Sequence, residues 1–191
     1  MKQTEITVQV LEKKEDIEKK LKEKNFVLVE NYLLKDYYFS KYDIERLKTM
    51  PFQEIIKNSF LVRDVNNDVS IIYKNKEFDE KGDTISEVKK RIKVNDKEIA
   101  LELFLSAGLT NWCKLTQDIY CYKNEEMEIL VQYVDSLGAF IEYEEDQSVA
   151  HLTAQEKLNV MIEKLKSLNF KMGSDFNVKK VYQKFKLENN L

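Results

Sequence analysis

The chain contains few of the residues from which many familiar active sites are built. Its 191 residues include one His (His151), two Cys, one Pro and four Gly. A single imidazole argues against His-rich zinc sites and against Ser–His or Cys–His catalytic pairs. Neither a P-loop nor a G-x-G-x-x-G motif is present. Any chemistry must therefore depend on carboxylates, Lys, Arg, Tyr or a bound metal ion.

Other absences concern location and partners. Two cysteines are too few for a disulfide framework, and the shared parity of Cys113 and Cys121 in strand-like sequence indicates buried thiols. No apolar run approaches the roughly 20 residues that span a bilayer, and residues 1–10 form no apolar secretory core, so we expect a cytoplasmic protein. The net charge of −3 argues against binding nucleic acid or a membrane surface, although it allows a local basic pocket.

Enough apolar residues are present, 43% of the chain, to build the core of a single domain covering residues 1–191. Alternating hydrophobicity predicts strands, and apolar residues three or four apart predict helices. The predicted strands cover 5–10, 25–40 (as one or two strands), 60–65, 69–78, 85–94, 111–123, 127–134 and 139–145. The predicted helices cover 13–24, 95–107 and two stretches within about 153–187, and residues 41–58 are expected to be a loop with some helix.

Local signals mark several of these boundaries. Asn66-Asn67-Asp68 is typical of a tight hairpin turn, and Gly82-Asp83 marks a second turn. Asn95 with Glu98, and Thr153 with Glu156, have the spacing of helix capping boxes. Gly108 is expected to end the helix that begins after Asn95. His151, which follows an acidic run, is expected at the surface.

The predicted order of elements favours an α+β fold with an antiparallel sheet, because regular βαβ alternation is missing. Strand positions of one parity carry charged residues. Two interpretations are open for this charged face: a solvated outer surface, or the polar inside of a closed barrel that holds a charged ligand. The charged positions are Glu5, Arg63, Lys74, Glu87, Glu142 and Glu144.

Several segments in order resemble the motifs of the CYTH superfamily, which unites class IV adenylyl cyclases, thiamine triphosphatases and related triphosphate tunnel enzymes. The stretch Val134-Asp-Ser-Leu-Gly-Ala-Phe-Ile-Glu-Tyr-Glu144 is similar to the L-G-x-F-x-E-x-E hallmark of that family. Further similar segments are Glu5 (E-x-E-x-K), Asp36-Tyr-Tyr-Phe39 (D-x-Y-F), Phe60-Leu-Val-Arg-Asp-Val65 (L-R-x-R-D-V), Ile71-Ile-Tyr-Lys74 (L-T-Y-K), Glu87 (R-x-E-x-E) and Tyr182 in the C-terminal helix (S-Y-x-x-L).

The resemblance implies a closed antiparallel barrel of eight strands, forming a tunnel, with flanking helices. It implies a divalent metal, Mg²⁺ or Mn²⁺, held by acidic side chains, and a small-molecule triphosphate gripped by basic ones. Hard divalent cations prefer carboxylate oxygens, and a triphosphate needs several cationic donors. By this resemblance the metal ligands are Glu5, Glu142 and Glu144, with Glu87 assisting, and the phosphate-binding residues are Arg63, Lys74, Lys89 and Arg91.

The chain also departs from the family pattern, and most departures remove a cation or an acid. The family residues are replaced by Thr7, Gln9, Leu61, Ile85, Lys89, Leu115, Gln117 and Gln132. Lys114 has the parity opposite to Leu115, so we expect it to point outward. Each lost charge-assisted hydrogen bond typically removes about 1.5–3 kcal/mol of phosphate binding.

Two hypotheses about function follow. The first is an enzyme acting on a triphosphate such as ATP, thiamine triphosphate or tripolyphosphate, either as a cyclase or as a hydrolase. The second is an inactive descendant that binds a different anion or serves as a scaffold, with Arg63 and Lys74 paired to Glu5 and Glu87. The sequence leaves open the substrate, the catalytic residues and whether the chain forms a homodimer.

Overall fold

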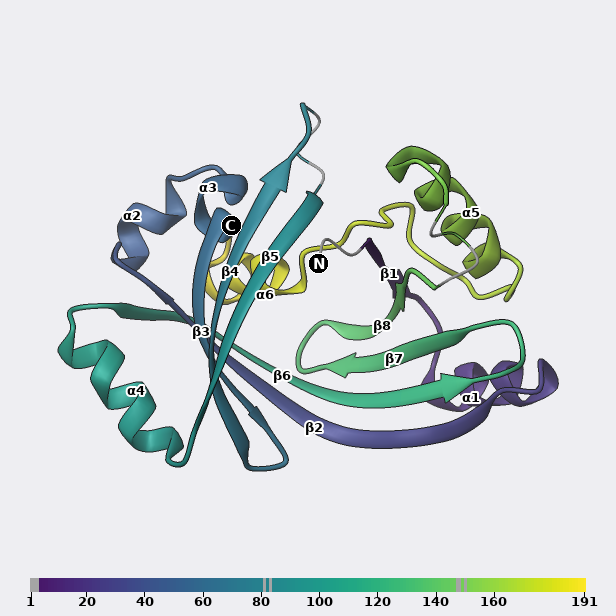
Figure 1. Cartoon of the computed structure of the whole chain (residues 1–191), viewed down its shortest axis with the longest axis horizontal. Coiled ribbons are helices and arrows are strands. Elements are labelled where there is room, and N and C mark those ends of the chain that lie inside the picture. The colour runs from purple at the N-terminus through teal and green to yellow at the C-terminus, as the bar shows by residue number, and fades with distance from the viewer. Residues whose placement is uncertain (1–3, 81, 83, 147–148, 150) are drawn as a thin grey trace. The chain divides into compact units, whose positions relative to one another are not determined.

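The computed structural model describes residues 4–80, 82, 84–146, 149 and 151–191 (Figure 1). Eight strands form one antiparallel sheet in the order β1-β8-β7-β6-β2-β3-β4-β5. The strands are β1 (Glu5–Val10), β2 (Val27–Ser40), β3 (Asn58–Val65), β4 (Asp68–Phe78), β5 (Thr84–Val94), β6 (Thr110–Lys123), β7 (Glu128–Val134) and β8 (Gly138–Glu144). The helices are α1 (Lys14–Glu23), α2 (Ile44–Lys48), α3 (Phe52–Lys57), α4 (Lys97–Ser106), α5 (Ala154–Lys166) and α6 (Lys180–Asn189).

The α+β class and the eight antiparallel strands are confirmed, whereas the predicted closure of the sheet into a barrel is not. Within the described residues, hydrogen bonds do not join the two end strands, β1 and β5. The free edge of β1 instead binds the segment before α6: Thr7 N–H donates to the Phe176 carbonyl at 3.1 Å, and Gly173 N–H donates to the Gln9 carbonyl at 2.9 Å. Backbone groups of β1 that would serve a closing strand are thus already bonded.

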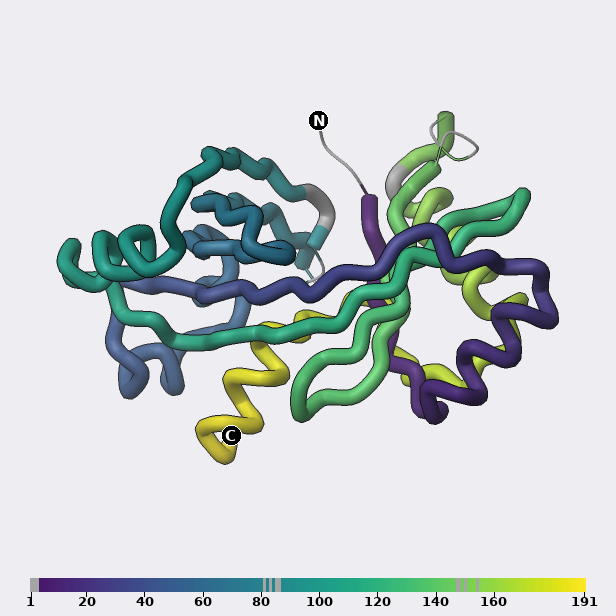
Figure 2. Tube along the Cα trace, turned by 90° about the horizontal axis from the view of Figure 1, so that it is seen from below, coloured from purple at the N-terminus to yellow at the C-terminus, as the bar shows by residue number. Residues whose placement is uncertain are grey.

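The chain groups into two compact units. The first contains Leu33–Thr116 and Lys180–Leu191, and the second contains Gln3–Tyr32 and Gln117–Lys179. The two longest strands, β2 and β6, are neighbours in the sheet and lie side by side in the trace (Figure 2). The assignment of residues 1–191 to one domain stays a prediction.

In the second unit, α1 and α5 pack against one face of the sheet. Strand alternation sends every second side chain of β1 and β8 to that face, where they form a continuous apolar core with the helices. Ile17 and Leu21 of α1 and Met161 and Leu165 of α5 are completely or almost completely buried in it. The opposite face of β1 and β8 therefore carries the other set of side chains, which includes the acidic ones.

The first unit repeats this arrangement with α4. Phe39, Val62 and Val69 pack with Ala100 of α4 on one face of β2, β3 and β4. Aromatic contacts join Tyr38 to Trp112, and Trp112 to Phe185 of α6. Six charged side chains of β3, β4 and β5 are instead on the strand positions that alternate with the α4-facing set: Arg63, Lys74, Lys76, Glu87, Lys89 and Arg91.

Most local predictions are confirmed. Asn66 and Asn67 have positive φ angles of 49° and 74°, as a tight hairpin turn requires, and Gly108 ends α4 with φ of 79°. Thr153 and Glu156 form the complete capping box of α5. Cys113 and Cys121 are both buried, and His151 is exposed. Asp83, predicted in the second turn, lies outside the described residues.

Residues 41–58 contain two short helices, α2 and α3, separated at Pro51, because proline fits the start of a helix but not its interior; the predicted loop with some helix is confirmed. One boundary prediction is wrong. The N-cap of α4 is Asp96 and not Asn95: the Asp96 carboxylate accepts from Ile99 N–H at 3.0 Å. The cap therefore lies one residue after the predicted pair of Asn95 with Glu98. No helix in the described residues has the length and apolar character needed to cross a membrane.

The position of this cap is testable. We expect Asp96→Ala to lower the free energy of unfolding by about 1 kcal/mol, since it removes the acceptor for a free helix N–H. Asn95→Ala is the matched control and should change stability by less than about 0.5 kcal/mol. Urea denaturation followed by circular dichroism measures both; equal losses for the two variants would contradict the assignment.

Candidate functional site

Three carboxylates of the second unit converge on the charged face of β1 and β8. Glu5 lies directly opposite Glu144 in the β1–β8 register, and Glu142 has the same parity two residues earlier. One carboxylate oxygen from each of Glu5, Glu142 and Glu144 lies within 4.8 Å of the others. The structure thus brings together three of the four predicted metal ligands from opposite ends of the sequence.

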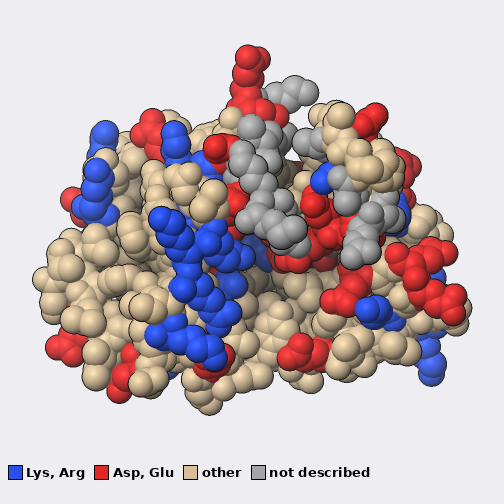
Figure 3. Space-filling view, viewed as in Figure 1, with Lys and Arg blue, Asp and Glu red and all other residues tan. Residues whose placement is uncertain are grey.

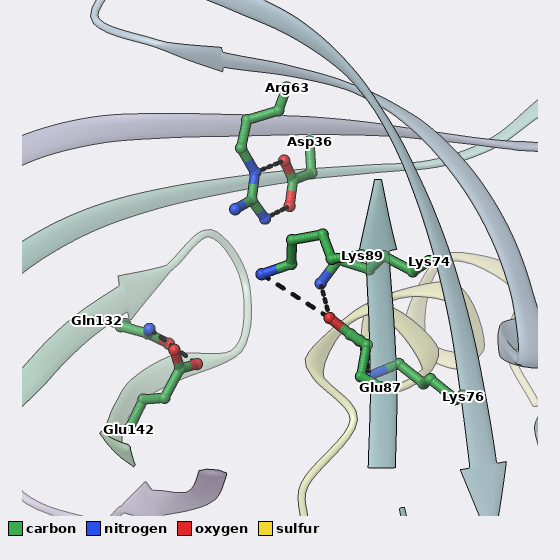
Figure 4. A network of polar contacts seen from close by, with 8 residues as sticks. All are labelled: Asp36, Arg63, Lys74, Lys76, Glu87, Lys89, Gln132 and Glu142. Atoms are coloured by element: carbon green, nitrogen blue, oxygen red, sulfur yellow. Dashed lines mark hydrogen bonds and ion pairs between the residues drawn. The ribbon is translucent and has the colours of Figure 1, made fainter. Parts of the chain in front are cut away.

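The three carboxylates differ in their surroundings. Glu142 is half-buried and accepts a hydrogen bond from Gln132 Nε2 at 3.1 Å (Figure 4). Glu5 and Glu144 are exposed. Gln132 itself is buried. Because Gln132 stands where the family has an acid, it orients Glu142 rather than adding a charge. Glu142 and Glu144 also line a cavity of about 390 Å³, together with Tyr32 and Glu128.

This donor set fits a hard divalent cation. All three groups offer carboxylate oxygens, the ligand type that Mg²⁺ and Mn²⁺ prefer over nitrogen or sulfur. The half-buried Glu142 is held by a hydrogen-bond partner, which is the usual arrangement around metal-binding carboxylates. The exposed Glu5 and Glu144 leave the cluster accessible to a ligand.

The first unit carries a cluster of opposite sign. Lys and Arg side chains gather along β5 on the face shown in Figure 3. In the β4–β5 register, Lys74 lies opposite Lys89 and Lys76 lies opposite Glu87. The side chains of Lys74, Lys76 and Glu87 are only 13%, 12% and 16% exposed, whereas Lys89 is 47% exposed. Lys74, Lys76 and Glu87 are therefore not part of a solvated outer surface.

Glu87 is surrounded by ammonium groups (Figure 4). Its Oε1 lies 3.4 Å from Lys74 Nζ and 3.8 Å from Lys89 Nζ, and its Oε2 pairs with Lys76 Nζ. The pairing of Lys74 with Glu87 that the second hypothesis anticipated is therefore observed. The role of Glu87 as a metal ligand stays a prediction, and its observed partners are those of a counterion.

Arg63 is held by a partner that the sequence analysis did not assign. Its Nε and Nη2 donate to the two oxygens of Asp36, at 2.7 Å and 2.6 Å. Asp36 is 1% exposed and faces Arg63 across the β2–β3 pair. Such a bidentate pair fixes the plane of the guanidinium. The pairing of Arg63 with Glu5 that the second hypothesis anticipated stays a prediction.

The remaining predicted positions divide into cationic and apolar ones. Arg91 is exposed, and its Nε donates to Ser70 Oγ at 2.8 Å. Lys114 is exposed and lies 5.4 Å from the Tyr37 ring, on the face that α4 covers, so its outward direction is confirmed. Leu61 and Leu115 are buried where the family has cations. The side chain of Ile85 lies outside what the structure describes.

The sequence analysis did not assign Asp36 or Lys76 to the site, although the sequence contains a pattern that points to each of them. Asp36 belongs to the segment similar to D-x-Y-F, but its partner could be identified only once the β2–β3 register was known. Lys76 follows Lys74 by two residues, and strand alternation alone places the two on the same face. Gln117, at the second lost cationic position, is also buried, and its Oε1 has no hydrogen-bond partner among the described residues.

The lysines around Glu87 make the stability of the protein sensitive to acid. Burial alone would raise the pKa of Glu87, but the charges of Lys74 and Lys76 lower it to about 2. A carboxylate with a depressed pKa stabilises the folded state above its unfolded pKa, and that stabilisation disappears as the pH falls toward the folded pKa.

We therefore expect stability to fall between about pH 4.5 and pH 2, and Glu87→Gln to flatten this part of the profile. Urea midpoints measured at several pH values test this. Glu125→Gln, at an exposed turn position, is the control and should keep the wild-type slope. An unchanged slope in Glu87→Gln would contradict the prediction.

The Asp36–Arg63 pair leads to a second prediction. Removing one partner of a buried ion pair leaves an uncompensated charge, so Asp36→Ala should lower the free energy of unfolding by about 3–5 kcal/mol. The control is Asp68→Ala, because Asp68 pairs with Lys93 in an exposed geometry (50% and 72% exposed) and should cost less than about 1 kcal/mol. Denaturant unfolding measures the free energy of unfolding of both variants. Comparable decreases would show that the buried ion pair contributes no more to stability than the exposed one.

No family model matches the chain. A curated protein from Methanocaldococcus jannaschii, named "Putative adenylate cyclase MJ0240", is 27% identical over 183 residues, which cover 95% of this chain and 97% of that protein. The similarity therefore extends over nearly all of both proteins.

Solved structures share the fold. The PH1012 protein from Pyrococcus horikoshii matches with a TM-score of 0.69 at 21% identity, covering 95% of this chain and 99% of that one. HpAC1 from Hippeastrum, an adenylyl cyclase by name with a dominant triphosphatase activity, matches with a TM-score of 0.60 at 12% identity, covering 98% and 96%. This fold, with a full-length relative named for adenylate cyclase, confirms the resemblance of the chain to the CYTH superfamily.

Proposed function

We propose that the protein is a CYTH-like enzyme that acts on a nucleotide or organic triphosphate with the help of a divalent metal ion. The observation that carries this proposal is the convergence of Glu5, Glu142 and Glu144 within 4.8 Å. Like charges at this spacing repel one another. A divalent cation shared by the three carboxylates would offset that repulsion.

In this proposal Mg²⁺ or Mn²⁺ is held by Glu5, Glu142 and Glu144. The ion would neutralise charge on the triphosphate and on the departing phosphate group. Gln132 keeps one oxygen of Glu142 in a hydrogen bond at 3.1 Å and so limits the orientations of that carboxylate.

The phosphate-binding groups are the cations of the first unit. Lys74 and Arg63 have the positions of family phosphate ligands, and Lys89 lies opposite Lys74 in the β4–β5 register. Asp36 holds the guanidinium of Arg63 in a fixed plane, which suits it to planar recognition of phosphate oxygens. Arg91, exposed on β5, follows Lys89 by two residues and shares its strand parity.

Two reactions are compatible with these groups. In a cyclase, the ribose 3′-hydroxyl attacks the α-phosphorus and pyrophosphate leaves; in a hydrolase, water attacks the γ-phosphorus and phosphate leaves. The name of the M. jannaschii relative favours the first, and the dominant activity of HpAC1 favours the second. Both need metal and cations but differ in which phosphorus is attacked.

The test is a panel of ATP, thiamine triphosphate and tripolyphosphate with Mg²⁺ or Mn²⁺, in which phosphate, pyrophosphate and cyclic AMP are measured together. We expect turnover of at least one substrate that EDTA abolishes. We also expect Glu142→Gln to raise the metal concentration needed for half-maximal turnover at least about tenfold. Glu125→Gln, which removes an exposed carboxylate of the same unit, should leave that concentration unchanged.

An inactive, anion-binding descendant is the second candidate, and one observation favours it. Leu61 and Leu115 are buried where the family has cations, so the phosphate-binding set is smaller than usual. The same panel separates the two candidates. No turnover of any substrate, with tripolyphosphate binding still measurable, would support the second candidate and contradict the first.

A further inference from the structure

Lys76 belongs to the cationic cluster, although no motif points to it. It follows Lys74 by two residues along β4, and both side chains are directed toward Glu87 (Figure 4). At 12% exposed, the Lys76 side chain is as buried as that of Lys74. A lysine on a half-covered sheet would usually extend its ammonium group into water, so a buried one calls for an explanation.

The charge balance around Glu87 is uneven. Three ammonium groups, on Lys74, Lys76 and Lys89, share a single carboxylate. Among the described residues, the ion pairs of Lys74 and Lys76 all go to Glu87. Arg63 adds no surplus, because Asp36 balances its charge. Two positive charges are therefore left over at a site where most of the groups are shielded from water.

A surplus of partly buried positive charge is costly unless an anion offsets it. Burial lowers the pKa of Lys74, and the charges of Arg63, Lys76 and Lys89 lower it further, although Glu87 opposes this. The cluster is thus electrostatically incomplete without a ligand. A phosphate group, with several anionic oxygens, matches two or three converging ammonium groups.

We propose that Lys76 is a phosphate-binding residue of this protein and that Glu87 is a positioning residue that holds Lys74, Lys76 and Lys89 together. This inference rests on the proposed function, since it assumes that the ligand is a triphosphate. Lys76 supplies a cation that the family pattern does not have, in a chain that has Leu61 and Leu115 in place of two others. The negative charge of Glu87 offsets the mutual repulsion of the three ammonium groups and so holds them close together.

The binding test uses the full chain and inorganic tripolyphosphate in EDTA, measured by titration calorimetry at two salt concentrations. We expect Lys76→Met to weaken tripolyphosphate binding at least about tenfold, as the loss of a charge-assisted hydrogen bond predicts. Lys76→Arg retains the charge and should bind within about threefold of wild type. Lys90→Met is the matched control, because Lys90 is an exposed β5 lysine opposite Tyr73, on the α4-facing set of positions; it should bind within about twofold.

The outcomes are distinguishable. If the wild type binds tripolyphosphate and Lys76→Met binds equally well, this inference is wrong while the proposed function stands. If the wild type does not bind tripolyphosphate in EDTA, this inference is wrong, and the proposed function is decided separately by the substrate panel with Mg²⁺ or Mn²⁺. Should Lys76→Met not fold, as judged by circular dichroism, Lys76→Gln in the same titration takes its place with the same expected loss.

The role of Glu87 has a separate readout. If Glu87 positions lysines, Glu87→Gln should leave the Mg²⁺ concentration for half-maximal thermal stabilisation unchanged, whereas Glu142→Gln should raise it. The effect of Glu87→Gln on tripolyphosphate affinity should also be smaller in a Lys76→Met background, since part of it acts through Lys76. Loss of Mg²⁺ binding in Glu87→Gln equal to that in Glu142→Gln would instead make Glu87 a metal ligand.

Discussion

The alternation of side chains along each strand is the constraint on which the rest of the structure depends. A strand sends neighbouring residues to opposite faces, so helices that cover one face leave the other face to a separate set of residues. α1 and α5 cover one face in the second unit, and α4 covers one in the first. Charged residues can therefore be concentrated on the remaining strand positions without disturbing either apolar core.

The two units concentrate charges of opposite sign on these remaining strand positions. The second unit gathers three carboxylates on β1 and β8, and the first gathers lysines around one carboxylate on β4 and β5. Within each cluster one sign of charge predominates. A metal ion suits the acidic cluster, and a phosphate group suits the basic one.

The surroundings of a glutamate decide what it does. Glu142 lies beside two other carboxylates and an amide donor, which is the environment of a shared cation. Glu87 lies among ammonium groups that lower its pKa to about 2 despite its burial. The two residues are chemically identical and occupy similar half-buried strand positions, yet one is suited to bind metal and the other to hold cations in place.

The sequence alone determined the fold class, most strands and helices, the Thr153 cap and the carboxylates of the acidic cluster, because these depend on local periodicity and on short motifs. The tertiary structure decided what depends on register between distant segments. Glu5 meets Glu144 only because β1 pairs with β8, and Arg63 meets Asp36 only because β3 pairs with β2. The edge of β1 is bonded by residues near 173–178, a contact with no sequence pattern of its own. Cross-strand partners, and hence which charges are balanced, follow from that pairing and not from the identity of any single residue.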